Sequence, residues 1–291
     1  SKSNPTLQIW HLNGSESKLS DKSFLYTFYE LNQPTETEKN LCKLHEKVFF
    51  SSSHSRNTFA NKGLNNCEYI PLGFDQDIKI STRQYFEDKI HFGLMGKLEK
   101  RKHTLKILKL WAERYGNNPD FELSCAITNR FIPVENLNQQ IGITLGGKHY
   151  DNINFIPFLS KNSEINDFMN AIDIDLTGLS GAEGWNLPSF NTTCLGKWSC
   201  VLNCTSHKDW ATKENSTLIE PEGMEDAYDN IFFQKGSDFN QGKINTFSDK
   251  SFYKSIETSI LKAKRKNKKG EELKNIFSYK KSVNLILEHI M

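Results

Sequence analysis

The sequence of 291 residues lacks a strong excess of charge of either sign. It contains 37 lysines and arginines against 35 aspartates and glutamates, which leaves a formal net charge of +2. Proteins whose main partner is nucleic acid usually carry a clear basic excess, so this balance argues against such a partner. A hydrophobic content of 37% beside 25% charged residues supports a packed core and excludes a chain that is disordered throughout.

Long apolar runs are also missing from the sequence. No stretch of about 18 apolar residues occurs, and residues 1–7 contain no apolar core of a secretory signal. We therefore expect neither a membrane-spanning segment nor a secreted protein, and we predict a cytoplasmic one.

The six cysteines include no CxxC pair and are scattered over predicted strands and helices, which fits a reducing compartment. Cys200 and Cys204, with His207 nearby, are residue types that bind zinc. Cys200, however, falls in an apolar, strand-like run over residues 198–202. We favour the interpretation without a metal.

Short β-rich runs alternate with helical patterns along the chain, which is typical of an α/β protein with parallel sheets covered by helices. The length favours two unequal units. Four runs in the first unit read as strands, at residues 7–12, 24–31, 47–52 and 67–72, with a helix at 55–62. A polar stretch from Pro71 to about Asp88 then reads as a linker.

The second unit opens with a strand over residues 90–95, followed by Gly96, a basic cluster at 97–103 and a helix. A strand, a glycine turn, basic residues and a helix start together favour a phosphate site. Further strands are expected at residues 121–127, 153–158, 172–176 and 199–203, and helices at 164–169, 252–269 and 279–290.

The stretch from Gly181 to Pro188, with Glu183 at its centre, is the most informative part of the chain. Small residues, an acid and a proline at a helix start describe a strand that ends and exposes backbone N–H groups before a helix. Free N–H groups and the helix dipole attract phosphate, and a carboxylate beside them accepts hydrogen bonds from sugar hydroxyls. An ordinary loop before a helix is the alternative reading of these residues alone.

Four blocks in a fixed order resemble the retaining GT-B glycosyltransferases of family GT4. They are residues 51–56 (SSSHSR), 70–75 (IPLGFD), 96–102 (GKLEKRK) and 183–188 (EGWNLP). The resemblance covers about residues 20–291. It implies two Rossmann-like domains facing each other across a cleft, the second binding a nucleoside diphosphate sugar and the first binding the acceptor.

The resemblance assigns roles to the basic turn. Gly96, Lys97 and Lys102 would surround the pyrophosphate and neutralise it as the leaving group, a task that metals perform in other transferases. Lys97 replaces the more usual arginine and loses its bidentate fork. Arg101 is read either as a supporting donor contact or as a surface residue. A solvated basic turn is the alternative for the whole cluster.

Glu183 corresponds to the first acid of the family's paired-glutamate motif. By resemblance, Glu183 and the backbone of Gly184, Trp185, Asn186 and Leu187 hold the donor sugar and the distal phosphate. The second acid is replaced by Asn191, whose amide oxygen accepts one ribose hydrogen bond without a charge. We expect weaker donor binding but not inactivity.

Two residues of the first unit are weaker candidates on the acceptor side. Glu30 lies at the end of the second predicted strand and His11 follows residues 7–10 of the first, where the acceptor domain would face the cleft. Both are read as surface residues more readily than as catalytic ones. The Asp-x-Asp triplets at residues 75–77 and 173–175 are interpreted as chance occurrences, and no metal or cofactor is expected.

Three units are predicted: residues 1–75, a partial acceptor-side domain; 76–278, the donor domain; and 279–291, a C-terminal helix that packs back on the first domain. The resemblance implies an earlier strand and glycine-rich loop, to which nothing here corresponds. We favour a shortened first domain over a reduced form that completes its cleft in another way, and an exposed sheet edge then predicts a homodimer or poor solubility. Residues 254–281 carry ten basic residues and three glutamates. This stretch is read as a solvated helix face, with peripheral contact to an anionic membrane as the alternative.

The sequence thus predicts a metal-independent retaining glycosyltransferase that moves a hexose from a UDP- or GDP-linked sugar to a glycan or lipid-linked acceptor. The alternative is a non-catalytic nucleotide-sugar binding or interaction protein of the same fold. A sugar-nucleotide epimerase fits less well, because residues 183–188 follow the transferase pattern.

Overall fold

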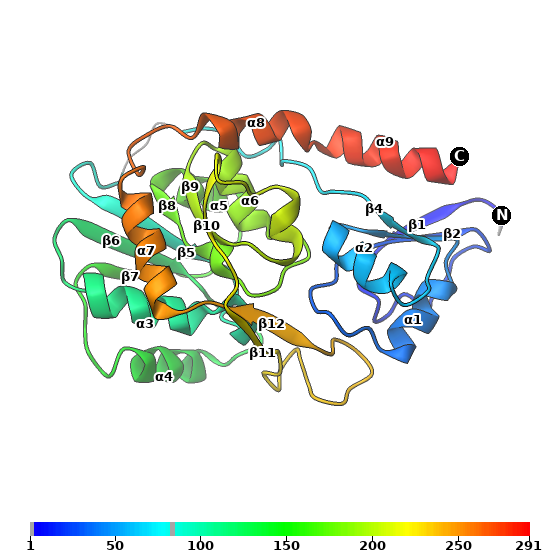
Figure 1. The fold of residues 1–291 in the computed structure, drawn as a ribbon, viewed down its shortest axis with the longest axis horizontal. Coiled ribbons are helices and arrows are strands. Elements are labelled where there is room, and N and C mark those ends of the chain that lie inside the picture. The colour runs from blue at the N-terminus through cyan, green and yellow to red at the C-terminus, as the bar shows by residue number, and fades with distance from the viewer. Residues whose placement is uncertain (1–2, 82–84) are drawn as a thin grey trace.

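The computed structural model describes residues 3–81 and 85–291 and contains two parallel sheets (Figure 1). The first sheet has the order β1-β2-β3-β4, with β1 (Thr6–Ile9), β2 (Ser23–Thr27), β3 (Lys47–Phe50) and β4 (Cys67–Tyr69). All its neighbouring strands are parallel. The four predicted strands are confirmed, but the second ends at Thr27 rather than Leu31, so Glu30 lies beyond the strand.

Two short helices accompany this sheet, each begun by a side-chain cap. Thr35 and Glu38 form a capping box at the start of α1 (Glu36–Lys43). The Ser52 hydroxyl accepts a hydrogen bond from Ser55 N at the start of α2 (Ser53–Ala60). Because β3 runs directly into α2, residues 51–53 lie at the carboxyl edge of the sheet.

The second sheet has six strands in the order β10-β9-β8-β5-β6-β7, and all its pairs are parallel. It contains β5 (Ile90–Met95), β6 (Phe121–Ala126), β7 (Ile153–Phe155), β8 (Ile174–Asp175), β9 (Trp198–Leu202) and β10 (Ser216–Ile219). Helices cover it on both faces: α3 (Thr104–Tyr115), α4 (Val134–Thr144), α5 (Asn162–Ala171), α6 (Leu187–Cys194) and α7 (Asp249–Ile260). Parallel strands buried by helices on both faces confirm the predicted α/β class.

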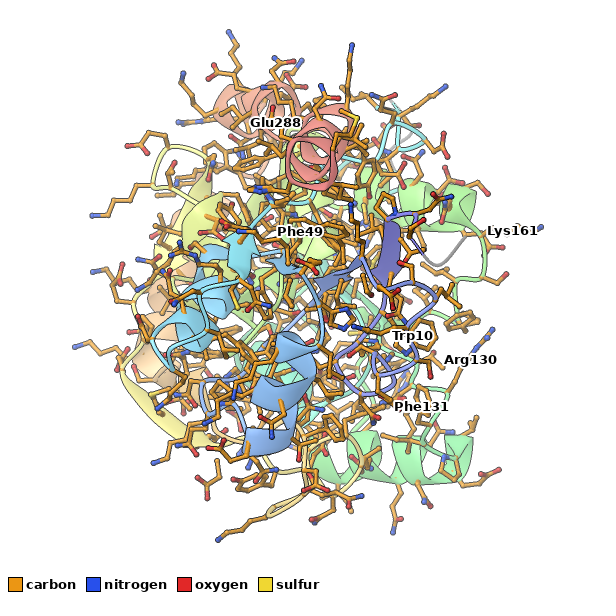
Figure 2. The ribbon with its side chains drawn as sticks, turned by 90° about the vertical axis from the view of Figure 1, so that its right-hand side faces the viewer. Trp10, Phe49, Arg130, Phe131, Lys161 and Glu288 are labelled. Carbon is orange, nitrogen blue, oxygen red and sulfur yellow. The ribbon has the colours of Figure 1, made fainter. Side chains whose placement is uncertain are left out.

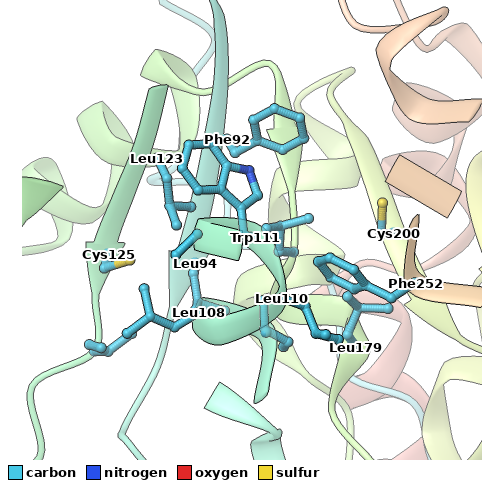
Figure 3. Close-up of a cluster of buried hydrophobic side chains, with 14 of the residues drawn as sticks. Phe92, Leu94, Leu108, Leu110, Trp111, Leu123, Cys125, Leu179, Cys200 and Phe252 are labelled. Atoms are coloured by element: carbon cyan, nitrogen blue, oxygen red, sulfur yellow. The ribbon is translucent and has the colours of Figure 1, made fainter. Parts of the chain in front are cut away.

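The largest apolar core of the described residues lies between the second sheet and its helices (Figure 3). Phe92 of β5 packs edge-on against Trp111 of α3, with ring centroids 5.8 Å apart. Trp111 is fully buried, as expected for the apolar face of an amphipathic helix that packs on a sheet. This packing fixes α3 against β5, and the basic turn is part of the connection between these two elements.

The single helix expected at residues 252–269 is two helices, which corrects that prediction. α7 ends at Ile260, and α8 (Lys268–Ile276) starts after a turn at residues 261–267. Four of the six residues from 261 to 266 are basic, so this stretch offers little apolar surface for a helix to bury. Asn267 then caps α8 by accepting a hydrogen bond from Gly270 N.

The C-terminal helix α9 (Tyr279–Ile290) lies along the first domain. Ile286 belongs to an apolar cluster with Phe24, Tyr26, Phe49 and Ile70 of that domain. Figure 2 looks onto the first domain, with Glu288 on α9 at the top and Phe49 of β3 beneath it. The C-terminal helix thus packs against the domain that the N-terminal part of the chain forms. No helix in the described ranges has the length and hydropathy needed to span a membrane.

A β-hairpin that the sequence did not predict extends from the second domain to the first. It consists of β11 (Gly223–Asp226) and β12 (Lys243–Thr246), with a long loop at residues 227–242. The loop is tied to the first domain by hydrogen bonds from Thr35 Oγ1 to Asp238 O (2.6 Å) and from Asn240 N to Glu38 Oε1 (2.8 Å). Apolar and polar residues alternate too irregularly in the hairpin segment for the sequence to predict two strands there.

Candidate functional site

The carboxyl edges of the two sheets meet at the loop that follows β8. Ser51 Oγ, just after β3, donates a hydrogen bond to Gly184 O across the domain boundary (2.7 Å). A Cβ added to Gly184 would lie 3.1 Å from Phe28 Cβ, so glycine permits the close approach here. In open α/β sheets this edge is where ligands bind.

Glu183 is the centre of a buried charge cluster. Its carboxylate lies 2.5 Å from Lys102 Nζ and 2.9 Å from an Arg101 guanidinium nitrogen. Arg101 also lies 3.0 Å from Glu99 and donates to Ala182 O (2.5 Å). Glu183 and Arg101 are only 6% and 7% exposed. The structure thus brings together three residues that the sequence placed in one site.

The charges of this cluster stabilise one another. Burial disfavours the ionised form of Glu183, yet Arg101 and Lys102 outweigh it and hold the pKa of this carboxyl well below its usual value. Burial likewise disfavours charged Arg101, but the carboxylates of Glu183, Glu30 and Glu99 raise its pKa. Glu183 is therefore an anion and Arg101 a cation over the whole physiological pH range.

Gly96 has the backbone conformation that the predicted turn needs. Its φ is 117°, in the region that favours glycine. A Cβ added there would lie 3.4 Å from Lys102 Cδ, so the lysine side chain passes directly over the turn on its way to Glu183. Lys102 itself ends a short 3-10 helix, η1 (Lys100–Lys102).

Lys97 occupies a different environment from Lys102. Its ammonium lies 5.1 Å from the ring centroid of Phe131 and 5.1 Å from that of Phe232, which is on the hairpin loop. The two rings meet edge to face at 5.0 Å. Lys97 is exposed and is held by cation–π contacts rather than by Glu183.

The loop after Glu183 exposes backbone donors. Within residues 3–81 and 85–291, the N–H groups of Gly184, Trp185 and Leu187 have no hydrogen-bond acceptor. Asn186 has a left-handed backbone (φ 66°) and caps α6 through its side chain, with Pro188 following. The start of α6 therefore offers unpaired N–H groups and the positive end of a helix dipole.

Asn191 lies inside this region with an unsatisfied oxygen. The residue is 5% exposed, and its Oδ1 has no partner among the described residues. Arg101 Nε and Trp185 Nε1 are buried without a partner in the same way. Buried polar atoms are nearly always paired in native proteins. Trp111 Nε1, in the core of the second sheet, also has no partner among the described residues, so unpaired atoms do not by themselves mark a ligand site.

The two weak acceptor-side candidates lie in different surroundings. Glu30 is half-buried and close enough to Arg101 to raise the pKa of that guanidinium. His11 is exposed, and its ring lies edge-on to that of Trp10, with the ring centroids 6.4 Å apart. The structure thus brings Glu30, but not His11, to the charge cluster.

The Asp-x-Asp triplets have structural hydrogen bonds. Asp175 is buried and accepts from Ser189 Oγ (2.6 Å) and Thr177 N (3.0 Å). Asp173 lies 2.8 Å from Lys264 Nζ. Across residues 3–81 and 85–291, no group of three His, Cys, Asp or Glu side chains is arranged to hold a metal ion.

Sequence reasoning missed the short 3-10 helix η3 (Thr205–Asp209). Thr205 Oγ1 accepts a hydrogen bond from Glu183 N (3.1 Å), and Asp209 accepts one from Ser53 N (2.8 Å). The signal was available, because this polar segment directly follows β9 at the carboxyl edge of the sheet. His207 of this segment was considered only as a metal ligand.

Comparison with solved structures identifies the fold of this chain, whereas comparison with family models and curated sequences finds no match. Among solved structures, Anabaena HepE in complex with UDP is similar with a TM-score of 0.63 and 15% identity, over 92% of this chain and 71% of that one. Sucrose-phosphate synthase from Thermosynechococcus elongatus gives a TM-score of 0.71 and 11% identity, over 97% and 71%.

TarM gives a TM-score of 0.66 at 11% identity; all of this chain is aligned, but it spans only 55% of the length of TarM. The similar structures are GT-B glycosyltransferases. The two parallel, helix-covered sheets that meet at Glu183 therefore give this chain the GT-B fold.

Proposed function

We propose that the protein is a glycosyltransferase that transfers a hexose from a nucleoside diphosphate sugar to a glycan or lipid-linked acceptor, with retention of configuration. One observation carries the proposal: the buried Glu183 lies between Arg101, Lys102 and a run of unpaired N–H groups at the start of α6. The similar structures include a protein in complex with UDP-glucose and one bound to ADP and acarbose.

The diphosphate of the donor is the group that best fits the unpaired donors. Lys102 and the N–H groups of Gly184 and Leu187 would neutralise it as negative charge builds up on the leaving phosphate. Glu183 would accept hydrogen bonds from sugar hydroxyls, and Asn191 Oδ1 would accept one from the ribose. In the structure, Lys102 pairs with Glu183.

The nucleobase is proposed to bind beside the basic turn. A cavity of about 450 Å³ lies at the carboxyl ends of β6 and β7, lined by residues 127–129 and 155–158 and by α4. Leu98 N donates to Ile127 O (3.0 Å), which places the cavity next to the turn that follows Gly96. Apolar walls with a few polar groups are typical of such sites.

In the proposed transfer, the bond between the anomeric carbon and the phosphate oxygen breaks and a bond to the acceptor oxygen forms on the same face. The acceptor proton passes to the departing phosphate, so the step requires no protein base and no metal. The protein contributes positioning and electrostatic stabilisation.

The test is release of UDP, GDP or ADP from the corresponding glucose nucleotide, with water and with a panel of glucosides as acceptors. We expect turnover with one nucleotide, loss of at least about 100-fold for Glu183→Ala and Lys102→Ala, and an α-linked product from an α-linked donor. The exposed pair Lys109 and Glu113 supplies matched alanine controls, which should keep full activity.

A non-catalytic nucleotide-sugar binding protein is the second candidate, favoured by the neutral Asn191 in place of a second acid. Such a protein would bind a glucose nucleotide at the same site but release no diphosphate with any acceptor. Turnover that is unchanged in both Glu183→Ala and Lys102→Ala contradicts the proposed site.

A further inference from the structure

The segment η3 connects three parts of the molecule through alternate side chains. Thr205 Oγ1 accepts a hydrogen bond from the backbone N–H of Glu183, and Asp209 accepts one from Ser53 N at the start of α2 in the other domain. Between them, His207 Nε2 lies 2.9 Å from Asn186 Nδ2. The segment therefore contacts the loop Glu183–Leu187 at two points and the first domain at a third.

Both ring nitrogens of His207 are used, which settles its tautomer. Nδ1 lies 2.8 Å from Leu202 O. Because a carbonyl oxygen only accepts hydrogen bonds, Nδ1 carries the proton and Nε2 accepts from the Asn186 amide. The side chain is fully buried, and burial lowers the pKa of His207 to about 4. The ring is therefore neutral and fixed in orientation at neutral pH.

Asn186 is the residue that His207 holds. Its left-handed backbone (φ 66°) is costly for a residue with a side chain, so the conformation needs support from its surroundings. The amide supplies that support: Nδ2 donates to His207 Nε2 and to Thr177 O (3.0 Å), while Oδ1 accepts from Ser189 N and caps α6. This conformation sets where the unpaired N–H groups of Gly184, Trp185 and Leu187 point.

We propose that His207 is a positioning residue for the distal phosphate and sugar of the donor, acting through the side chain of Asn186. The inference rests on the proposed function. In this role, the ring of His207 does not contact the ligand. It fixes the conformation of the loop that contacts the ligand, and it belongs to the segment η3, which also contacts the acceptor-side domain.

The test compares nucleotides that use this loop with nucleotides that do not. Affinity is measured by calorimetry for three pairs: UMP and UDP-glucose, GMP and GDP-glucose, AMP and ADP-glucose. A monophosphate lacks the distal phosphate and the sugar. For the pair that the unmodified protein binds, His207→Leu should lower the affinity for the sugar nucleotide by about tenfold or more. The affinity for the monophosphate should stay within about twofold of that of the unmodified protein.

Two further variants separate positioning from folding. His207→Gln, which retains a hydrogen-bond acceptor and a donor, should recover most of the lost affinity. Asn186→Gly keeps the left-handed backbone but removes the amide. If His207 acts through that amide, the double variant His207→Leu with Asn186→Gly should bind no more weakly than Asn186→Gly alone. The exposed His149 gives a matched control, His149→Leu, with unchanged affinity for both nucleotides.

The outcomes distinguish this inference from the proposed function. No binding of any nucleotide by the unmodified protein contradicts both. Normal binding with an equal loss for monophosphate and sugar nucleotide in His207→Leu, or multiplicative losses in the double variant, contradicts the positioning role alone. A His207→Leu protein that does not fold leaves His207→Gln and the Asn186→Gly variant to decide. Unchanged selectivity in Asn186→Gly then overturns the inference.

Discussion

The carboxylate of Asp209, in the second domain, accepts a hydrogen bond from the backbone N–H of Ser53 at the start of α2 in the first domain, at 2.8 Å. The Ser53 hydroxyl donates to the same carboxylate. Burial raises the pKa of Asp209, and the hydrogen bonds from Ser53 partly offset this. The positive end of α2 is thus occupied by an acid from the opposite domain, which ties the two carboxyl edges together beside the candidate site.

Replacing this acid should weaken the domain contact. Asp209→Asn retains the size of the side chain but loses the charge-assisted bonds, so we expect the free energy of unfolding to fall by about 1–3 kcal/mol. Urea unfolding followed by fluorescence measures the change. Asp21→Asn, at an exposed position, should have no effect. Equal midpoints for Asp209→Asn and the unmodified protein would show that the contact is energetically neutral.

The buried ion pairs of Glu183 predict a large stability effect from a small chemical change. Glu183→Gln removes the carboxylate that faces both Arg101 and Lys102. Arg101 then remains buried with Glu99 as its close partner, and we expect a loss of about 3 kcal/mol in the free energy of unfolding. Chemical denaturation at pH 7 tests this. A loss no larger than that of Glu113→Gln on the exposed face of α3 would contradict it.

The pH dependence of stability should report the burial of His207. The pKa of His207 is about 4 in the folded protein against 6.5 for an unperturbed histidine. Between these values the unfolded chain binds one more proton, so the free energy of unfolding falls as the pH drops from 6.5 to 4, by roughly 1.4 kcal/mol per pH unit.

The histidine variant provides the comparison for that pH dependence. Between pH 7 and pH 5 the unmodified protein should lose ~2 kcal/mol more than His207→Gln, because the other histidines are common to both. Urea unfolding at the two pH values gives the difference. Parallel losses in the two proteins would mean that His207 is not held neutral by burial.

Gly242, which immediately precedes β12 beside the first domain, should not tolerate a side chain. Its φ is 135°, and an added Cβ would lie 2.3 Å from Asn32 Oδ1. Gly236 also has a positive φ (78°), but an added Cβ there has no neighbour within 4 Å. Gly242→Ala should therefore destabilise by about 1–3 kcal/mol more than Gly236→Ala. Equal melting temperatures of the two variants would show that the hairpin shifts to accommodate the added methyl group without a cost in stability.

Much of the fold follows from local sequence pattern. The runs at residues 47–50, 90–95 and 198–202 are apolar and bounded by turns, so they read as buried parallel strands, and the stripe ending at Tyr115 reads as an amphipathic helix. The hairpin β11–β12 was missed because its strands are only four residues long and β11 is exposed at every residue, and because the contacts that hold it, such as that of Asn240 with Glu38, come from the other domain.

The candidate site was predictable to the extent that its residues carry a motif. The resemblance of residues 96–102 and 183–188 to family motifs placed Lys102 and Glu183 in one site, and the structure brings them into contact. Spacing did not reveal that Lys97 lies between two phenylalanine rings, because Phe232 is far away in the chain. Nor did it reveal the role of His207, whose partner Asn186 is set by tertiary packing alone.

The central claim, that a nucleoside diphosphate sugar binds between Lys102 and Glu183, is tested most directly by calorimetric titration with UDP-, GDP- and ADP-glucose. We predict binding of one of them by the unmodified protein, and loss of that binding by about 100-fold in Glu183→Ala and in Lys102→Ala, with only Lys102→Ala also weakening the bare diphosphate. No binding of any of the three, or the same affinity in both variants as in the unmodified protein, would contradict the account.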